Sequence, residues 1–434
     1  MTVAGLGAGA GRASSAREAE RWLLSLELFG MRFGLDRMRR LMTALGSPND
    51  AFRSIHVVGT NGKSSTVRMI AALLHHHGVR AGAYLSPHLV SFTERVRVAG
   101  ADISDEQFAA AVGRARHAAE LVDRTLGEDD RVTQFEALTA AAYAHLAGAG
   151  VEVAVVEAGL GGRWDATNVI GAEVVVLTNV GLEHTRWLGP TVADVAREKL
   201  AVVSASDPPA TLVLGHGLHP DADAEAQAVA QRTGARVVHA PAEPPPGMEL
   251  LARGAFQRRN FAVACAAAEA YLGRLEAQPL RAAAASTAVP GRFEVVAAGA
   301  EGPEVVLDGA HNPGGIEALA ESLPAFLAGR PLVAVLSVLD DKDAAGMLAS
   351  LLPLCAGAVF TTNANPRALS PATLGSLAGQ VGAPPVARVE SDPGRAVALA
   401  SELAGPQGVV LATGSIYLIA DLVRPARAAR ASTL

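Results

Sequence analysis

Short apolar runs alternate with helical repeats along most of the chain. Ser54 to Val58 is a β-branched run, and Ser64 to His77 then carries apolar residues at helical spacing. Gly78 ends this predicted helix. Further strands are predicted at 81–85, 151–156 and 174–178, and further helices at 105–121 and 134–148. Because strands that are apolar on both faces and alternate with helices form parallel sheets, we expect an α/β fold with a mostly parallel, doubly wound sheet.

A break near residue 290 divides this pattern. Segment 240–247, APAEPPPG, is predicted to be a surface loop, and segment 285–291, ASTAVPG, interrupts the alternation again. The alternation then restarts, with strands predicted at 305–307, 332–336, 359–361 and 409–412 and a helix at 315–327. We therefore expect a larger domain over residues 1–289 and a smaller, Rossmann-like α/β domain over residues 290–434. We expect no fixed structure up to about residue 15.

The composition favours a soluble protein with sizeable cores. Half of the 434 residues are hydrophobic, and the net charge of -6 argues against a nucleic-acid partner, which would require a clustered basic face. No uncharged apolar run of about 18 residues suggests a membrane span. The two cysteines, Cys265 and Cys355, lie in alanine- and leucine-rich surroundings and are expected to be reduced core residues. We therefore expect a cytoplasmic protein, and a monomer.

The loop after the first predicted strand favours a phosphate site. It reads Gly59-Thr60-Asn61-Gly62-Lys63-Ser64-Ser65 and lacks the first glycine of G-x-x-x-x-G-K-[ST], where Val57 stands. Val57 belongs to the strand, so a shorter loop can still direct backbone N–H groups and a helix N-terminus at an anion. Lys63 would reach a terminal phosphate and a hydroxyl would bind Mg²⁺. The alternative is a structural glycine turn.

Lysine is rare in this chain. Lys63, Lys199 and Lys342 are the three lysines among 37 basic residues, so arginine supplies the general surface charge. A lysine amine, unlike a guanidinium, can lose its proton, which makes each lysine a candidate for chemistry. A neutral Lys199 could take up CO₂ and become a carbamate, an oxygen ligand suited to Mg²⁺. A salt bridge with Glu198 or Asp194 is the alternative.

Polar side chains follow the ends of several predicted strands. Glu157 ends one buried strand before a glycine-rich segment, and His184 follows the next strand. Ligands bind at the carboxyl ends of strands in open parallel sheets, so both are metal-ligand candidates. Each has a structural alternative, a solvated acid or a core histidine. In the second domain Asp308 and His311 end a strand in the same way, and Lys342 follows the next one. The two sets of loops are expected to face each other across an interdomain cleft.

With these segments together, the chain resembles the folylpolyglutamate and dihydrofolate synthases, the folate branch of the Mur-type ATP-dependent amide ligases. The resemblance extends from about residue 33 to residue 417, in the order of the family. It rests on the 59–65 loop, Ser86-Pro87-His88-Leu89, Glu94-Arg95, Phe135-Glu136, residues 157–168, His184, Glu198-Lys199, Gln257 with Asn260, Pro290-Gly291-Arg292, residues 308–313 and Asp341-Lys342-Asp343.

The resemblance implies a role for each of the candidate residues. In the family, a serine, a glutamate and a histidine hold Mg²⁺, and they fall on Ser86, Glu157 and His184. The carbamylated lysine of the family falls on Lys199, and its phosphate-loop lysine on Lys63. By the same matching, Asn260 and Arg292 take the positions that contact ATP, while Asp308 and His311 line the cleft near the incoming amino acid.

The resemblance also implies the reaction. ATP would phosphorylate a carboxyl group of a folate or of dihydropteroate, and the amine of L-glutamate would displace phosphate from the acyl phosphate. Residues 1–289 would then bind ATP, and residues 290–434 would bind glutamate. Lys63 and Mg²⁺ would neutralise charge on the transferring phosphoryl group, and closure of the domains would exclude water.

Several residues depart from the usual pattern of the family. Ser64 replaces a loop glycine, so Ser64 as well as Ser65 is a candidate Mg²⁺ ligand. Phe256 stands where a histidine is usual, Glu183 where an aspartate is usual, and Ser337 where a glycine is common. These changes bear mainly on substrate range.

Two alternatives to the folate ligase fit the sequence less well. A cell-wall amino-acid ligase would carry an additional N-terminal domain of roughly 100 residues, but the loop lysine is already residue 63. An inactive nucleotide-binding module would not need Lys199, Glu157 and His184 together with Asp308 and His311.

Overall fold

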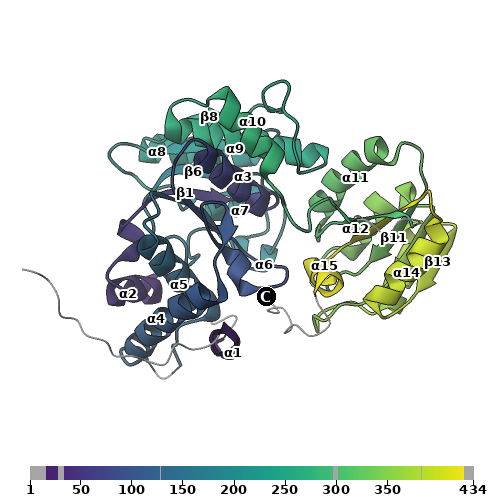
Figure 1. The fold of residues 1–434 in the computed structure, drawn as a ribbon, viewed down its shortest axis with the longest axis horizontal. Helices are drawn as coiled ribbons and strands as arrows, with labels where there is room; N and C mark the ends of the chain where they lie inside the picture. The colour runs from purple at the N-terminus through teal and green to yellow at the C-terminus, as the bar shows by residue number, and fades with distance from the viewer. Residues whose placement is uncertain (1–15, 28–33, 128, 297–301, 383, 425–434) are drawn as a thin grey trace, which may run out of the picture.

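Two sheets with helices on both faces make up the protein. The computed structural model describes residues 16–27, 34–127, 129–296, 302–382 and 384–424. Figure 1 shows a larger lobe that carries the first sheet and a smaller lobe that carries the second. The expectation about the chain up to residue 15 falls outside the described residues. No helix among the described residues is long and apolar enough to cross a membrane.

The first sheet has eight strands in the order β4-β3-β2-β5-β1-β6-β7-β8. They are β1 (Arg53–Val58), β2 (Ala81–Tyr84), β3 (Val96–Val98), β4 (Ala101–Asp102), β5 (Val153–Glu157), β6 (Ala172–Leu177), β7 (Thr211–Leu214) and β8 (Arg236–His239). Every pairing is parallel except those of β3 with β2 and with β4, so the sheet is mostly parallel, as the alternation predicts. β1 therefore lies at the centre of the sheet, between β5 and β6.

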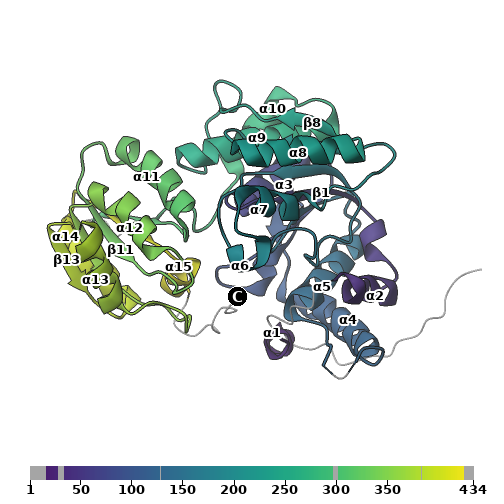
Figure 2. The same cartoon turned by 180° about the vertical axis from the view of Figure 1, so that it is seen from behind.

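Helices cover both faces of this sheet (Figures 1 and 2). Ile55 and Val57 of β1 pack into the core formed with α3, α9 and α10, while alternate positions of the sheet face α1, α2, α4 and α5 on the other side. The helices are α1 (Ala16–Ser25), α2 (Asp36–Ala44), α3 (Lys63–His76), α4 (Asp105–Asp123), α5 (Gln134–Gly148), α6 (Thr185–Leu188), α7 (Val192–Leu200), α8 (Pro220–Thr233), α9 (Ala255–Leu272) and α10 (Ala277–Ser286), with the short 3₁₀ helices η1 (Pro48–Asp50) and η2 (Phe92–Arg95).

The second sheet has the strand order β13-β12-β11-β14-β10-β9. Its strands are β9 (Glu294–Val296), β10 (Glu304–Leu307), β11 (Leu332–Leu336), β12 (Gly357–Phe360), β13 (Val386–Val389) and β14 (Val409–Thr413). Its helices are α11 (Pro313–Leu327), α12 (Ala344–Leu351), η3 (Leu352–Leu354), α13 (Pro371–Val381), α14 (Pro393–Ala404) and α15 (Ile416–Val423). One core packs against α11, α12 and α13 and the other against α14 and α15. Only β9 is antiparallel among these pairings.

The connection between the sheets lies near the predicted break. α10 ends at Ser286 and β9 begins at Glu294, on either side of residue 290. The lobes touch mainly through α9 and α11 and through Leu89, which packs against Ile419 of α15. This connection supports the division into residues 1–289 and 290–434, which we keep as a proposal.

Candidate functional site

The candidate functional site is an open cavity of about 1100 Å³ between the lobes. Its walls come from the loop before α3, the ends of β5 and β6, the segment around Phe135, and loops after β10 and β11 of the second sheet. Except for the Phe135 segment, which lies at the start of α5, these loops follow the carboxyl ends of parallel strands, which is where ligands bind in open α/β sheets. The volume exceeds the roughly 300–1,000 Å³ that is usual for one drug-sized ligand, so the cavity can hold more than one substrate.

The loop between β1 and α3 has the backbone geometry of an anion cradle. Gly59 has φ +149° and Gly62 has φ +82°, conformations that L-residues with a side chain rarely adopt. A Cβ atom at Gly59 would lie 1.9 Å from Thr178 Oγ1, and one at Gly62 would lie 2.5 Å from Asn260 Oδ1. Glycine is therefore required at both positions, because there is no room for a Cβ atom and because the backbone has a positive φ. The missing glycine of the usual motif is replaced by Val57 inside β1, as the sequence predicts.

Two residues after β6 hold this loop from behind. The Asn61 N–H donates to Asn179 Oδ1 at 2.8 Å, and the Thr178 hydroxyl donates to Asn61 O at 2.7 Å. The Lys63 ammonium donates to Gly59 O and Thr60 O, so it lies over the loop in which a phosphate would sit. Thr60, Asn61, Gly62, Lys63, Ser64 and Ser65 all line the cavity. Thr178 and Asn179 were not singled out from the sequence, although they stand at the end of the strand predicted over 174–178.

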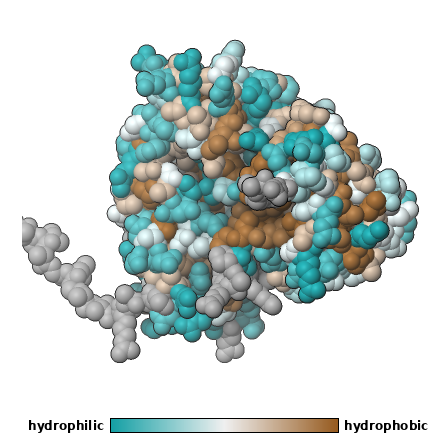
Figure 3. Space-filling model, turned by 45° about the vertical axis from the view of Figure 1, so that its right-hand side comes forward, coloured by the Kyte–Doolittle hydropathy of each residue, from teal (hydrophilic) through white to brown (hydrophobic). Residues whose placement is uncertain are grey.

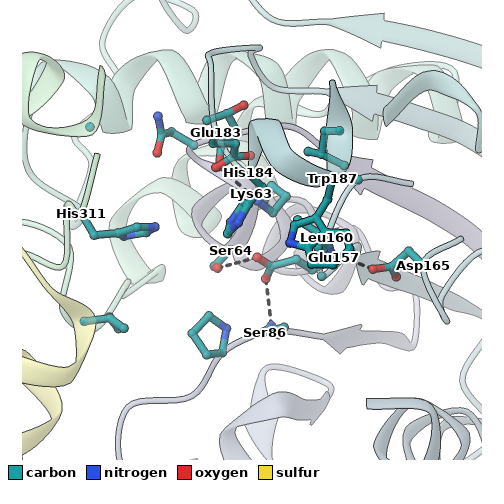
Figure 4. Close-up of a pocket in the computed structure, with 18 of the residues that line it drawn as sticks. Lys63, Ser64, Ser86, Glu157, Leu160, Asp165, Glu183, His184, Trp187 and His311 are labelled. Carbon is teal, nitrogen blue, oxygen red and sulfur yellow. Dashed lines mark hydrogen bonds between the residues drawn. The ribbon is translucent and has the colours of Figure 1, made fainter. Parts of the chain in front are cut away.

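Glu157 lies at the end of β5, opposite the start of α3 (Figure 4). Its side chain is buried; Oε1 accepts from the Ser64 hydroxyl at 2.9 Å and Oε2 from the Ser86 N–H at 3.1 Å. Burial raises the pKa of Glu157, against the opposing effect of Lys63 and these two hydrogen bonds. Two other predicted metal ligands thus contact this carboxylate, Ser64 through its hydroxyl and Ser86 through its backbone N–H.

His184 lines the same cavity, just before α6. Its φ of +48° is left-handed, a conformation that is uncommon for a residue with a side chain and that is often found at functional sites. Burial and the nearby Lys342 lower the pKa of His184, which keeps the ring neutral and able to bind a cation. Among the described residues, no three His, Cys, Asp or Glu side chains form a metal cluster. A cation here would therefore complete its shell with serine hydroxyls, phosphate oxygens and water, as Mg²⁺ commonly does.

Lys199 is buried on α7 and does not line the cavity. Its ammonium donates to Gly59 O at 2.9 Å and to Glu183 Oε1 at 2.9 Å. The predicted alternative partners are wrong, because Glu198 pairs with Arg163 and Asp194 pairs with Arg197. Burial lowers the pKa of Lys199, against the attraction of Glu183. For Glu183, burial opposes ionisation, but Lys199 and Lys63 outweigh it and lower the pKa to about 2.

The far end of the cavity is apolar and aromatic. Figure 3 shows hydrophobic side chains gathering where the lobes meet. The apolar lining residues are Phe135, Leu160, Trp164, Trp187 and Leu188. Asp165 lies among them as a buried carboxylate that accepts from the Leu160 N–H at 2.8 Å (Figure 4). Burial raises the pKa of Asp165. This residue was not singled out from the sequence, although it lies within the 157–168 segment.

A buried ion pair borders the same end of the cavity. Arg37 donates from Nε to both carboxylate oxygens of Glu136 at 3.0 Å and contacts Asp130 at 2.7 Å. The N–H and hydroxyl of Thr133 also donate to Glu136. This network fixes the start of α5, and with it Phe135, beside the apolar wall.

The second lobe contributes Arg292, Asp308, His311 and Lys342. Asp308 accepts backbone N–H groups of Phe293 and Ala310 at 2.8 Å each, so its carboxylate fixes the loop that carries His311. His311 Nδ1 lies 2.9 Å from Gly309 O and therefore donates to it, which leaves Nε2 as an acceptor. Burial lowers the pKa of His311 to about 4, so the ring is neutral.

One pair of amides joins the lobes across the cavity. Asn61 Nδ2 donates to Asn312 Oδ1 at 3.2 Å, and Asn312 Nδ2 donates to Asn61 Oδ1 at 3.0 Å. Asn61 belongs to the anion cradle, and Asn312 is the N-cap of α11. The phosphate loop is thereby linked directly to the second sheet.

Comparisons with known proteins agree with this geometry. Residues 57–245 match the Mur ligase middle domain, and residues 291–416 match the Mur ligase, glutamate ligase domain. The dihydrofolate synthase/folylpolyglutamate synthase of Mycobacterium tuberculosis is 36% identical over 80% of this chain and 77% of its own length. The chain belongs to this family of Mur ligases.

Solved structures extend the similarity to the whole fold. The folylpolyglutamate synthase of M. tuberculosis complexed with ADP has a TM-score of 0.85 and 34% identity, covering 94% of this chain and 97% of the other. A second member of the family, solved with Mn, AMPPNP and L-glutamate bound, has a TM-score of 0.80 and 28% identity with the same coverage. The prediction of a two-sheet Mur-type ligase fold is confirmed.

The departures from the family pattern have structural places. Ser64 contacts Glu157, Glu183 pairs with Lys199, and Phe256 lines the cavity and packs near Phe293 with ring centroids 6.4 Å apart. The Ser337 hydroxyl is buried and accepts from Asn363 at 2.8 Å, so this serine is structural.

Proposed function

We propose that this ligase joins L-glutamate to a carboxyl group of a folate-type acid at the expense of ATP. One observation carries the proposal: a phosphate loop, a buried carboxylate with two hydroxyl-bearing neighbours, an aromatic compartment and a neutral histidine of the second lobe share one cavity. Each of these features suits a different participant in the reaction. The relatives, which are ligases that form C–N bonds, support the same assignment.

The described residues fit a nucleotide with a divalent cation. Consecutive N–H groups of the 60–65 loop, the N-terminus of the 14-residue helix α3 and Lys63 suit the phosphates. Asn260, which touches Gly62, and Arg292 suit the rest of the nucleotide from the two sides of the cleft. Ser64 or Ser65, Ser86, Glu157 and His184 would hold the cation. When bound, Mg²⁺ neutralises charge on the transferring phosphoryl group.

The aromatic compartment fits a flat ring system attached to a carboxyl group. Phe135, Leu160 and Trp164 provide apolar faces, and Asp165 provides an acceptor for an N–H group at the edge of a ring. An acid bound there would extend its carboxyl group toward Lys63 and Glu157 (Figure 4).

The chemistry then follows from charge. A carboxylate resists attack by an amine, so the acid must first become an acyl phosphate. Lys63 stabilises charge on the phosphoryl group as it moves. The His311 ring is neutral, and Nε2 can accept a hydrogen bond because Nδ1 is the nitrogen that donates to Gly309 O. Nε2 accepts a hydrogen bond from the amine of glutamate and so orients the lone pair of the amine toward the acyl carbon. Asp308 holds the loop of His311 in place, and Trp164 and Trp187 help to exclude water.

Lys199 is proposed to act as a carbamate. Its burial and lowered pKa favour the neutral amine that reacts with CO₂, and Gly59 O and Glu183 hold the amine beside the phosphate loop. The carbamate would supply a charged oxygen toward the cation site. Lys199→Ala should lose most activity, and short carboxylic acids in the buffer should partly restore it. An unimpaired variant would dispose of the carbamate.

The test of the function offers dihydropteroate and tetrahydrofolate separately with ATP, Mg²⁺ and labelled glutamate. Incorporation with either acid supports the proposal, and the pair of results defines the substrate range. If neither acid takes up glutamate while ADP still forms with another acid, the folate assignment fails and the ligase assignment stands.

We also propose that the chain works as a monomer in the cytoplasm. A single chain supplies both walls of the cavity, and the two cysteines are buried and free, in keeping with a reducing compartment. Sedimentation at micromolar concentration tests the first statement, and fractionation of cells tests the second.

A further inference from the structure

A histidine lies buried in the central strand of the first sheet. His56 belongs to β1, is fully buried, and stands in a strand whose other five residues include three with purely apolar side chains. Burying a polar ring in such a place costs free energy unless its hydrogen bonds are satisfied. Nδ1 of His56 has no hydrogen-bond partner among the described residues. The other ring nitrogen, Nε2, therefore makes the one side-chain hydrogen bond that offsets this cost.

That contact begins a short chain of hydrogen bonds that ends in the cavity. His56 Nε2 lies 2.9 Å from the hydroxyl of Thr167, and this hydroxyl lies 2.5 Å from Asp165 Oδ1. The N–H of Thr167 also donates to Oδ1, and the N–H of Leu160 donates to Oδ2. Tyr143 fixes the backbone of Thr167 by donating to its carbonyl at 3.0 Å. Of the three linked side chains, only Asp165 lines the cavity.

Counting protons gives the chain a direction. The hydroxyl of Thr167 has one proton, and it donates this proton to Asp165 Oδ1 at 2.5 Å. The hydroxyl oxygen must then accept from His56, so His56 carries its proton on Nε2. The opposite tautomer would leave a buried Nδ1–H donor without a partner. Nε2 would then need the proton of the Thr167 hydroxyl, and two acceptors, the hydroxyl oxygen and the carboxylate oxygen, would face each other. Burial also lowers the pKa of His56 to about 3, so the ring stays neutral.

We propose that His56 is a positioning residue for the acid substrate: through the Thr167 hydroxyl it holds the Asp165 carboxyl group in a fixed orientation at the aromatic end of the cavity. His56 does not touch the substrate itself. Its effect is to make Asp165 an acceptor that selects acids bearing an N–H group on the ring. This inference rests on the proposed function, because it takes the aromatic compartment to be the acid site.

The kinetic test compares removal of each link with its conservative replacement. Thr167→Val removes the hydroxyl at nearly constant shape, and Thr167→Ser keeps it; His56→Leu removes the donor, and His56→Gln keeps an N–H group of similar reach. Removal variants should raise the KM for the acid by about 5-fold to 100-fold, the range for a buried partner left unpaired. The KM for ATP should stay within about twofold of the wild-type value, because the nucleotide site is a separate part of the cavity and independent sites differ by no more than this. The Ser and Gln variants should recover most of the loss.

A double variant tests whether the two residues act as one unit. His56→Leu combined with Thr167→Val should be little worse for the acid than Thr167→Val alone, because His56 acts only through the hydroxyl. Multiplied effects, or equal increases in the KM values for ATP and the acid, would overturn the proposal. Thermal unfolding of each variant identifies any that fail to fold, and the Thr167 pair then carries the test.

A spectroscopic measurement is independent of activity. In protein labelled with ¹⁵N-histidine, the shifts of His56 should report a neutral ring protonated at Nε2 near pH 7. This signal should change in Thr167→Val but not in Thr167→Ser. A proton found on Nδ1, or a ring that titrates near neutrality, would refute the hydrogen-bond chain from His56 through Thr167 to Asp165. If this chain is present but no folate-type acid takes up glutamate, the proposed function has failed and the hydrogen-bond chain has not.

Discussion

At the scale of single residues, Glu157 is the point at which the chemistry of the cavity meets. It joins the start of α3 to Ser86, and the charge of Lys63 is the main influence that opposes the effect of burial on its pKa. A cation at this position must compete with a proton, because burial raises the pKa of Glu157. The affinity for Mg²⁺ is therefore tied to pH.

We expect the affinity for Mg²⁺ to fall on mild acidification. A raised pKa means that Glu157 takes up a proton at a higher pH than an exposed glutamate does, so the loss begins at a less acidic pH. Calorimetry in two buffers of different ionisation enthalpy measures the protons released on binding. Glu157→Gln should abolish that release and weaken binding by at least about tenfold, a change typical of metal-site variants. Unchanged proton release in the variant would contradict the assignment.

The phosphate-loop glycines provide a second test at this scale. Gly59→Ala and Gly62→Ala place a Cβ atom within 2.5 Å of Thr178 or Asn260 and impose a rare φ. Such strain costs about 1–3 kcal/mol, so nucleotide affinity should fall by about tenfold or more. Gly171→Ala is the matched control, because nothing lies within 4 Å of its Cβ position. Fluorescence titration with a labelled nucleotide distinguishes them; equal affinities in all three variants would exclude the cradle.

The Glu183 and Lys199 pair should govern stability in acid. The folded-state pKa of Glu183 is lowered from 4.5 to about 2, so its stabilisation is complete above about pH 4.5 and is lost as the pH falls toward 2. Urea unfolding of the metal-free protein between these pH values should show a steeper loss for the wild type than for Glu183→Gln. Parallel curves would show that the pair is not formed.

The sequence identified the residue types of the site more readily than their partners. Lys63, Glu157 and His184 could be singled out because they follow strands, and strand ends share one edge of a parallel sheet. Glu183 could not be recognised as the partner of Lys199, since the two lie 16 positions apart on different elements. His56 gave no signal, because a single histidine in a strand has no periodicity to report its contacts.

At the scale of elements, the long amphipathic or buried segments were predictable and the short edge elements were not. The helix at 134–148 was predicted with its observed bounds, and 332–336 is likewise β11. β3, β4, β8 and β13 have two to four residues each, and all of their positions except Val96 are at least partly exposed, so they lack the apolar runs that mark buried strands. Tertiary pairing, which local pattern cannot show, decides such strands.

Helix α11 connects an element-scale feature to the site. Asn312 caps this helix by accepting from the Gly315 N–H at 2.8 Å, and it also pairs with Asn61. Asn312→Ala should lower the free energy of unfolding by about 1 kcal/mol, as loss of a cap usually does. Asn312→Asp keeps the cap but cannot donate to Asn61. Chemical denaturation should therefore separate the two variants, and equal losses would show that the cap is not the source of the stability.

At the scale of the whole molecule, the cavity depends on how the two lobes meet. Its phosphate loop and metal-facing residues belong to the first sheet, whereas Arg292 and His311 belong to the second. The sequence predicted two facing sets of loops from the polar residues at strand ends. It could not predict the contacts that join them, such as Asn61 with Asn312 or Arg259 with Glu321, because these lie 251 and 62 positions apart.

A nucleotide bound in this cavity should act as a bridge between the lobes, and Arg292 allows a test. Arg292 lies at the start of the second lobe, packs against Gly309 and lines the cavity, where its charge acts on Glu157. Arg292→Ala should therefore leave the first lobe folded but weaken the binding of Mg²⁺ and ATP by about tenfold, since a charge-assisted contact contributes about 1.5–3 kcal/mol. Calorimetry measures the affinity, and small-angle scattering measures whether nucleotide still reduces the radius of gyration.

Arg259→Ala is the control, because its ion pair with Glu321 crosses between the lobes but does not line the cavity. If both variants lose affinity equally, the lobes are coupled by their contact surface alone; if only Arg292→Ala does, the nucleotide itself draws them together.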